Sequence, residues 1–158
     1  MSVPPRALQI PPNCDLTLGL RCVDKSTPGR TVWQMVADER FANPANLVQG
    51  GFVGALADSA MGASAVTFAQ DRKVGVVNAE MKVSFLRPVN VGSVLSCEAV
   101  VVSGGRRAAF VEATVTDESA AMVARATSTY LYSEREDFAG SAPPAVTGLA
   151  TGAPGGGG

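Results

Sequence analysis

The pattern of hydrophobic and polar residues divides the first half of the chain into a hairpin and a helix. Residues 16–23 and 31–37 have strand-like composition, and the turn-forming sequence KSTPG at 25–29 lies between them. From Gly50 or Gly51 to about residue 69 the sequence GGFVGALADSAMGASAVTFA has many alanines and no proline. We expect a helix here, with Phe52, Leu56 and Val66 on or near one side.

After this helix the hydrophobic period changes to two. Between residues 78 and 85 apolar side chains alternate with polar ones, which predicts a half-buried strand ending at Arg87-Pro88. Three further strand-like runs cover 94–102, 107–116 and 122–132. Short turn signals at 90–92, 103–105 and 117–119 separate them, so we expect the four strands to form an antiparallel meander.

The helix is apolar nearly all round, so it must be wrapped by the sheet or covered by a second subunit. The sequence therefore predicts an α+β fold with a central helix, in one domain of residues 15–136. Residues 1–14 form an N-terminal extension. The remaining segment, 137–158, is rich in Gly, Pro and Ala, and we expect a flexible tail with no assigned function.

Composition and charge exclude several classes of function. The 158 residues carry a net charge of -1, which gives no long-range attraction to nucleic acid or to an anionic membrane. Prolines near the start disfavour a signal peptide, so a cytoplasmic protein is expected. The three cysteines lack metal-ligand spacing and are expected to be small buried thiols. With no histidine, the chemistry must use carboxylate, amide, hydroxyl or backbone groups.

Asp58 is the strongest candidate for a functional side chain, because it is the only charged residue between Arg40 and Asp71. A carboxylate buried in this helix would be costly and should have a raised pKa, which favours a functional role. Two other interpretations remain open, a carboxylate satisfied by donors from an adjacent strand and one that faces water. Its neighbours one helical turn away are Gly54, Ala55, Met61 and Gly62.

The polar entry to the helix, residues 43–51, is a second candidate. Free N–H groups at a helix N-terminus can stabilise a carbonyl oxygen that develops negative charge. The alternative is that Gly50 and Gly51 form only a turn, while Asn43 or Asn46 caps the helix. Asp58 lies eight residues beyond Gly50, about 12 Å along the axis. One ligand group could meet both only if the loop folds back or a second subunit supplies one of them.

Two stretches carry a family resemblance. NPANLVQGGFVGALADSAMGA at 43–63 and NAEMKVSFLRP at 78–88 resemble the signatures of hot-dog-fold acyl-CoA thioesterases of the phenylacetate-degradation (PaaI) and 4-hydroxybenzoyl-CoA thioesterase group. The likeness covers roughly residues 15–133. It implies an antiparallel sheet wrapped around a long helix, in dimers that often pair into homotetramers. It also implies active sites at the subunit interface, where Gly50 of one subunit can face Asp58 of the other.

The resemblance also implies a role for each matching residue. Asp58 corresponds to the catalytic carboxylate, either nucleophile or general base, and Gly50 to the backbone N–H that polarises the thioester carbonyl. Asn43 corresponds to the amide that orients water, and Asn78 stands where Ser or Thr is common. Gln49 replaces the usual histidine of a His-Gly-Gly triplet, and an amide can donate a hydrogen bond but cannot titrate near neutral pH.

Coenzyme A carries phosphates, and the resemblance places its nucleotide near the outer strands. Arg87, Arg106 and Arg107 are the candidates, since guanidinium groups bind phosphate well. Solvated charges at an exposed hairpin tip are the alternative for each of them. The acyl group is expected beside the small residues Gly54, Ala55 and Gly62, and Gly51 is a further candidate for binding the substrate or coenzyme A.

The sequence thus predicts an enzyme that hydrolyses an acyl-CoA thioester as a homo-oligomer. No metal or redox cofactor is expected, because coenzyme A enters as part of the substrate. A non-catalytic acyl-CoA-binding module is the main alternative. A hot-dog hydratase or dehydratase is disfavoured, because the similar enzymes of that type use an Asp-His pair and this chain has no histidine.

Overall fold

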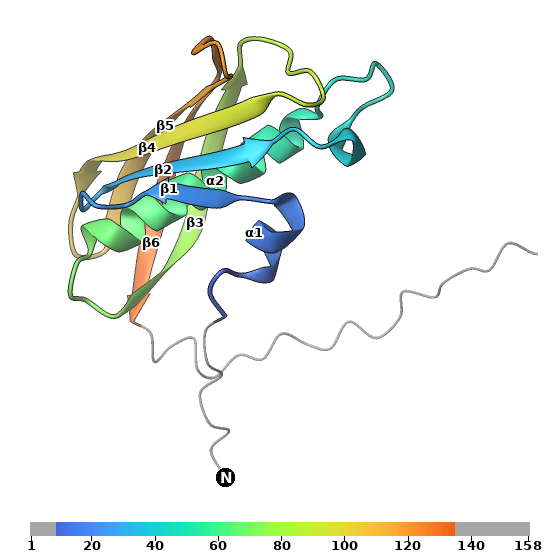
Figure 1. Ribbon diagram of the computed structural model, residues 1–158. Helices are drawn as coiled ribbons and strands as arrows, with labels where there is room; N and C mark the ends of the chain where they lie inside the picture. Colours follow the sequence, from blue (N-terminus) through green and yellow to red (C-terminus); the bar gives the residue numbers. More distant parts are fainter. Residues whose placement is uncertain (1–8, 135–158) are drawn as a thin grey trace, which may run out of the picture.

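The computed structural model describes residues 9–134, and the chain forms two α-helices, a short 3-10 helix and six strands (Figure 1). The predicted tail and most of the predicted N-terminal extension lie outside these residues. In chain order the elements are α1 (Asn13–Leu18), β1 (Arg21–Asp24), β2 (Arg30–Val36), η1 (Glu39–Phe41), α2 (Gly50–Phe68), β3 (Val74–Phe85), β4 (Val94–Gly104), β5 (Ala108–Thr116) and β6 (Met122–Glu134).

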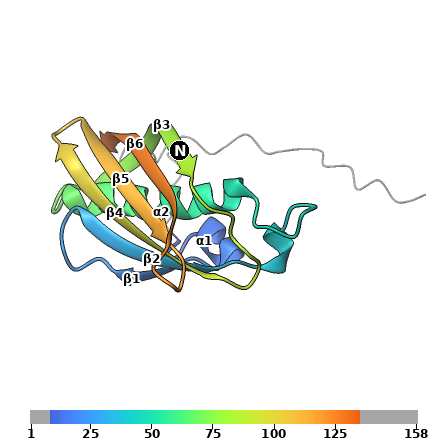
Figure 2. The same ribbon diagram turned by 90° about the horizontal axis from the view of Figure 1, so that it is seen from above.

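The strands form one antiparallel sheet in the order β1-β2-β4-β5-β6-β3. The sheet curves around α2, which runs along its inner face (Figures 1 and 2). The predicted α+β architecture with a central helix is confirmed, and α2 begins and ends within one residue of the predicted bounds.

The core lies between α2 and the sheet. On the sheet side, Met35, Leu95, Val111 and Val115 are almost completely buried. Five of the buried residues of the helix are Gly, Ala or Ser, which let it approach the strands closely. The buried residues of α2 are Val53, Gly54, Leu56, Ala57, Ala60, Met61, Ser64 and Ala65. By length and composition α2 could cross a membrane, but this packing is that of a core helix. Of the three large side chains predicted for one side, Val66 is 41% exposed and faces away from the core.

Buried hydroxyl groups fix the helix on the sheet. Thr31 donates from Oγ1 to the carbonyl oxygen of Ala60 over 2.8 Å, and Ser64 donates from Oγ to that of Gly29 over 2.6 Å. Both side chains are fully buried, so each hydrogen bond removes the cost of an unsatisfied polar group. Gly29 has a φ of 78°, which suits glycine at the end of the β1–β2 turn.

The predicted first strand is partly wrong, because residues 13–18 form the helix α1 and β1 starts only at Arg21. The strand-like composition of residues 16–23 suggested a strand. In the structure the Leu16 N–H donates to the carbonyl of Pro12, and Gly19, with a φ of 66°, ends the helix. The hairpin of β1 and β2 itself is confirmed.

The predicted four-strand meander is also wrong in one respect. Only β4, β5 and β6 follow one another, whereas β3 pairs with β6 at the far edge of the sheet. Residues 86–93 are not a hairpin turn but a connection that crosses one end of the sheet. Its start bonds to β6 through Val123, and its end bonds to Ala37 beside β2.

β3 is an edge strand of twelve residues, longer than predicted, and it begins at Val74. Three of its apolar side chains are unusually exposed: Val77 at 50%, Met81 at 37% and Phe85 at 55%. A long apolar edge strand is a site at which another chain readily pairs.

Candidate active site

Asp58 lies in the middle of α2 and is exposed, so the expectation of a carboxylate buried within the chain is wrong. Its Oδ1 atom nevertheless accepts two hydrogen bonds, from Asn78 Nδ2 at 2.8 Å and from the Tyr130 hydroxyl at 2.6 Å. Within residues 9–134, no hydrogen bond reaches Oδ2. One oxygen of the carboxylate is therefore fixed and the other is open.

The sheet register brings the two donors together. Asn78 on β3 lies directly opposite Tyr130 on β6, and a β-bulge follows between Asn78 and Glu80. The buried Ser128 Oγ lies 3.0 Å from Asn78 Oδ1 and 2.8 Å from the Glu80 carbonyl. Because a carboxylate can only accept, the amide group turned toward Asp58 must be the NH₂, and its oxygen faces Ser128. This fixes the orientation of the amide.

Tyr130 is the site residue that the sequence interpretation missed. Its side chain is only 2% exposed, and burial, followed by the hydrogen bond to Asp58, raises the pKa of its phenol. The phenol therefore stays protonated and acts as a donor. The one available signal was a tyrosine at a buried position of the last alternating strand, since a buried hydroxyl needs a partner.

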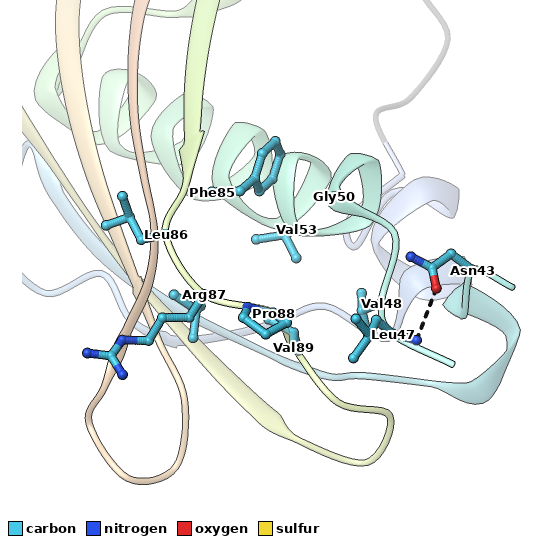
Figure 3. Close-up of a pocket in the computed structure, with 11 residues that line it drawn as sticks. Asn43, Leu47, Val48, Gly50, Val53, Phe85, Leu86, Arg87, Pro88 and Val89 are labelled. Atoms are coloured by element: carbon cyan, nitrogen blue, oxygen red, sulfur yellow. Dashed lines mark hydrogen bonds between the residues drawn. The ribbon is translucent and has the colours of Figure 1, made fainter. Parts of the chain in front are cut away.

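Gly50 occupies the first position of α2, next to a surface cavity of about 440 Å³ (Figure 3). A methyl group placed on Gly50 would come within 2.8 Å of the Phe85 ring, so glycine lets this exposed ring lie against the start of the helix. The first N–H groups of a helix have no intrahelical partner. The cavity is lined by Asn43, Leu47, Val48, Gly50, Val53, Phe85, Leu86, Arg87, Pro88, Val89 and Val123.

Asn43 also borders this cavity, but its side-chain oxygen is occupied by its own loop. Oδ1 accepts from the N–H groups of Ala45 at 2.9 Å and Leu47 at 3.2 Å, which leaves the NH₂ group for a ligand. Gln49 is exposed and is the N-cap residue, without a side-chain capping bond. The alternative in which Asn43 or Asn46 caps the helix is therefore wrong.

The structure separates the candidate residues into two groups. Asn43, Gln49 and Gly50 lie at the start of α2, whereas Asp58 and Asn78 lie about 12 Å further along its axis. The loop before the helix does not fold back toward Asp58, since it bonds to Phe41 and Val89 instead. Within one chain, therefore, the two groups are too far apart to contact the same ligand group.

The small residues of α2 differ in their surroundings. Gly54 is buried, and a methyl group there would lie 3.9 Å from Met81 and 4.0 Å from Val83, so β3 fills that space. At Gly62 a methyl group would lie 3.5 Å from the Tyr130 ring, whereas Gly51 is exposed with open space around it. The predicted acyl site beside Gly54 and Gly62 is thus occupied by this chain's own side chains.

The three candidate arginines lie near different ends of α2, Arg87 near its start and the other two near its end. Arg87 borders the cavity near Gly50, with its guanidinium pointing away from Gly50 (Figure 3). Arg106 and Arg107 lie in the β4–β5 turn, next to Gly104, which is packed against Phe68 at the other end of the helix. The helix has 19 residues, about 28 Å, so one phosphate group cannot contact all three within one chain.

The cysteines only partly follow the prediction that all three are buried. Cys97 is fully buried, and desolvation raises the pKa of its thiol to about 12, whereas Cys14 is exposed and Cys22 is half-buried. In the described part of the chain, no group of three His, Cys, Asp or Glu residues is placed to hold a metal ion.

A comparison with protein-family profiles identifies the family of this chain. The family profile described as the thioesterase superfamily matches residues 45–124, about half of the chain, and the match includes both Gly50 and Asp58. The chain belongs to the thioesterase superfamily. It is a thioester hydrolase with a PaaI-like hot-dog fold, which confirms both the predicted enzyme class and the predicted fold. No curated protein matches the chain.

Solved structures of similar proteins share this fold. A phenylacetic acid degradation-related protein from Ralstonia eutropha JMP134 is 29% identical, with a TM-score of 0.69 over 76% of this chain and 89% of that one. A mutant of the phenylacetic acid degradation protein PaaI from Thermus thermophilus is 26% identical, with a TM-score of 0.67 over 74% and 96%. The smu.793 protein from Streptococcus mutans UA159, bound to acetyl CoA, is 21% identical, with a TM-score of 0.67 over 73% and 89%, and shares the fold.

Proposed function

We propose that this thioesterase hydrolyses an acyl-CoA to the free acid and coenzyme A, with Asp58 as the catalytic carboxylate. The observation that carries this proposal is the asymmetry of Asp58. Two donors fix Oδ1, while Oδ2 is open on an exposed side of the helix. An oriented carboxylate with one free oxygen can attack a thioester carbonyl or take a proton from water.

Three observations support coenzyme A as the leaving group: a structural relative bound to acetyl CoA, the apolar lining of the cavity, and an arginine at its border. The hot-dog fold of the Streptococcus mutans protein accommodates acetyl CoA. In this chain the cavity beside Gly50 is lined mainly by apolar side chains, which suits an acyl or pantetheine segment. Arg87 at its border, and Arg106 and Arg107 elsewhere, are the candidate phosphate partners.

A second copy of the chain completes the site in this proposal. β3 presents a free edge, so two copies can pair their β3 strands antiparallel about a twofold axis. If that axis passes near Lys82, the partner's Phe85 lies opposite Ala79 in the bulge, next to Asn78. Because Phe85 packs on Gly50 and Asn78 bonds to Asp58, the partner's Gly50 then faces Asp58.

The reaction follows from this arrangement by one of two routes. As a general base, Oδ2 takes a proton from water while the water oxygen attacks the thioester carbon. As a nucleophile, Oδ2 attacks that carbon itself and forms an anhydride, which water then hydrolyses. In both routes the partner's Gly50 N–H stabilises the oxyanion, the C–S bond breaks, and the CoA thiolate leaves and is protonated.

The experiment that tests the proposal is Asp58→Asn, assayed with a panel of acyl-CoAs and a thiol reagent that detects released CoA. We expect kcat to fall by at least about a hundredfold while acyl-CoA affinity is kept, because the amide retains the shape but cannot act as base or nucleophile. Asp71→Asn, the same change at an exposed position just beyond α2, should leave kcat unchanged. Full turnover in Asp58→Asn would remove Asp58 from the mechanism.

A further inference from the structure

The Tyr130 side chain lies between the sheet and α2, with its hydroxyl group at Asp58. The hydroxyl oxygen lies 2.6 Å from Asp58 Oδ1 and 3.0 Å from the backbone carbonyl oxygen of the same residue. The ring runs beneath Gly62, one turn further along the helix, and is almost completely buried. Packing therefore fixes the ring, and the ring fixes the position of the hydroxyl.

The geometry points to a defined role for this hydroxyl. We propose that Tyr130 is the positioning residue of the thioesterase site: with Asn78 it holds Oδ1 of Asp58, so that Oδ2 is the oxygen that reacts. This inference rests on the proposed role of Asp58 and adds to it the residue that selects the reacting oxygen. Tyr130 contacts Asp58 rather than the substrate.

The two donors, Asn78 and Tyr130, are suited to hold the Asp58 carboxylate in one orientation. A hydrogen bond to a charged group contributes more than a bond between neutral groups, and two donors on one oxygen restrict rotation of the carboxylate. Asn78 is held from behind by the buried Ser128, and Tyr130 is held by core packing. The raised pKa of the phenol keeps its proton in place for this hydrogen bond.

The chain offers a matched control two residues further along the same strand. The Tyr132 hydroxyl also reaches from β6 to α2, where it donates to the backbone carbonyl of Ala65 over 2.7 Å. Both tyrosines therefore link the last strand to the helix, but only Tyr130 contacts the carboxylate. Tyr132→Phe removes a structural bond of the same kind and leaves the site intact.

The test compares kcat, KM and thermal unfolding for Tyr130→Phe and Tyr132→Phe. We expect Tyr130→Phe to lower kcat roughly ten- to hundredfold, which corresponds to the loss of one hydrogen bond to a charged group. KM should stay within about twofold, because the lost contact acts only in the chemical step. Tyr132→Phe should keep kcat even if its unfolding temperature falls. Equal kcat values for the two variants would overturn the proposal.

A double-mutant cycle separates this inference from the proposed function. If Tyr130 acts through Asp58, adding Tyr130→Phe to Asp58→Asn should have no further effect on the residual rate. An equal loss in both backgrounds would contradict the positioning role. Full turnover in Asp58→Asn would instead contradict the proposed function itself.

Should Tyr130→Phe fail to fold, 3-fluorotyrosine at position 130 keeps both the ring and the hydroxyl group while making the phenol a stronger donor. We then expect a changed kcat at unchanged KM, with no change for the same replacement at position 132. An unchanged kcat at position 130 would overturn the proposal.

Discussion

The side-chain amide of Asn78 donates a hydrogen bond to Asp58, with 2.8 Å between Nδ2 and Oδ1. This contact joins the middle of the central helix to the edge strand β3. It also places the candidate carboxylate next to the strand edge at which a second copy of the chain is proposed to pair.

Asn78→Asp should strongly impair this site, because it replaces a donor by an acceptor of the same shape. Two neighbouring carboxylates repel each other, so Asp58 would turn away from position 78 and its Oδ1 atom would no longer be held there. We expect kcat at neutral pH to fall about tenfold or more, by the loss of one charged hydrogen bond. Asn46→Asp, an equal change of charge in an exposed loop, is the control. An unaltered kcat in Asn78→Asp would show that the contact has no role.

Phe85 covers Gly50 and forms one wall of the cavity, so it should limit the size of the acyl group. Phe85→Ala enlarges the cavity, and we expect kcat/KM to shift in favour of acyl-CoAs with bulkier acyl groups. The readout is the ratio of kcat/KM for a long and a short acyl-CoA. Phe110→Ala makes the same change at a partly exposed position on β5. If both variants kept the wild-type ratio, the cavity would not be the acyl site.

Leu56 is completely buried at the centre of the helix–sheet interface. Leu56→Ala should lower the free energy of unfolding by about 2–5 kcal/mol, because it removes buried methyl groups and leaves a cavity. Leu16→Ala is the matched control, since Leu16 is 59% exposed on α1 and should change stability by less than about 0.5 kcal/mol. Chemical denaturation measures both values, and similar losses in the two variants would contradict the described core.

The thiols should react in the order of their burial. At pH 8 we expect Cys14 to react rapidly with a disulfide reagent, whereas the raised pKa of Cys97 keeps that buried thiol protonated and unreactive. Burial also raises the pKa of Cys22, which should react more slowly than Cys14. Cys14→Ser should abolish the fast phase, and three thiols should react in the unfolded wild-type protein. A fast phase that persists in Cys14→Ser would show that another thiol is accessible.

Local periodicity was sufficient to predict most of the elements. The central helix and the strands β4 and β6 begin at or next to the predicted residues, because each pattern depends only on neighbouring side chains. The partner of β3 could not be predicted in this way. An alternating strand has the same pattern whichever strand it pairs with, and the crossing segment 86–93 contains ordinary turn residues. The helix α1 was missed because its last residues, 16–18, fall within a stretch of strand-like composition.

The part of the site that lies on the central helix could be predicted from the sequence. Asp58 and Gly50 lie on the same helix, and their separation along its axis follows from helix geometry. Tyr130 reaches Asp58 only through the register of β6 against β3, a contact between residues 72 positions apart. Burial of Asp58 was wrongly expected because the apolar helix is covered by the sheet on one side only.

The claim that each site takes Asp58 from one chain and Gly50 from its partner can be tested by complementation. Asp58→Asn removes the carboxylate. Gly50→Pro removes the N–H at a position where the helix backbone accepts proline, since Gln49 before it is extended, with φ −65° and ψ 132°. The exposed Phe85 ring must turn aside to admit the added Cβ atom. Each variant alone should be inactive, because both of its sites lack one group.

The deciding measurement is the activity of a heterodimer of these two variants, co-expressed with different tags and purified through both. One of its two sites combines an intact Asp58 with the partner's intact Gly50, so we expect about half of the wild-type activity per dimer. A heterodimer as inactive as the two parent proteins would contradict the shared site.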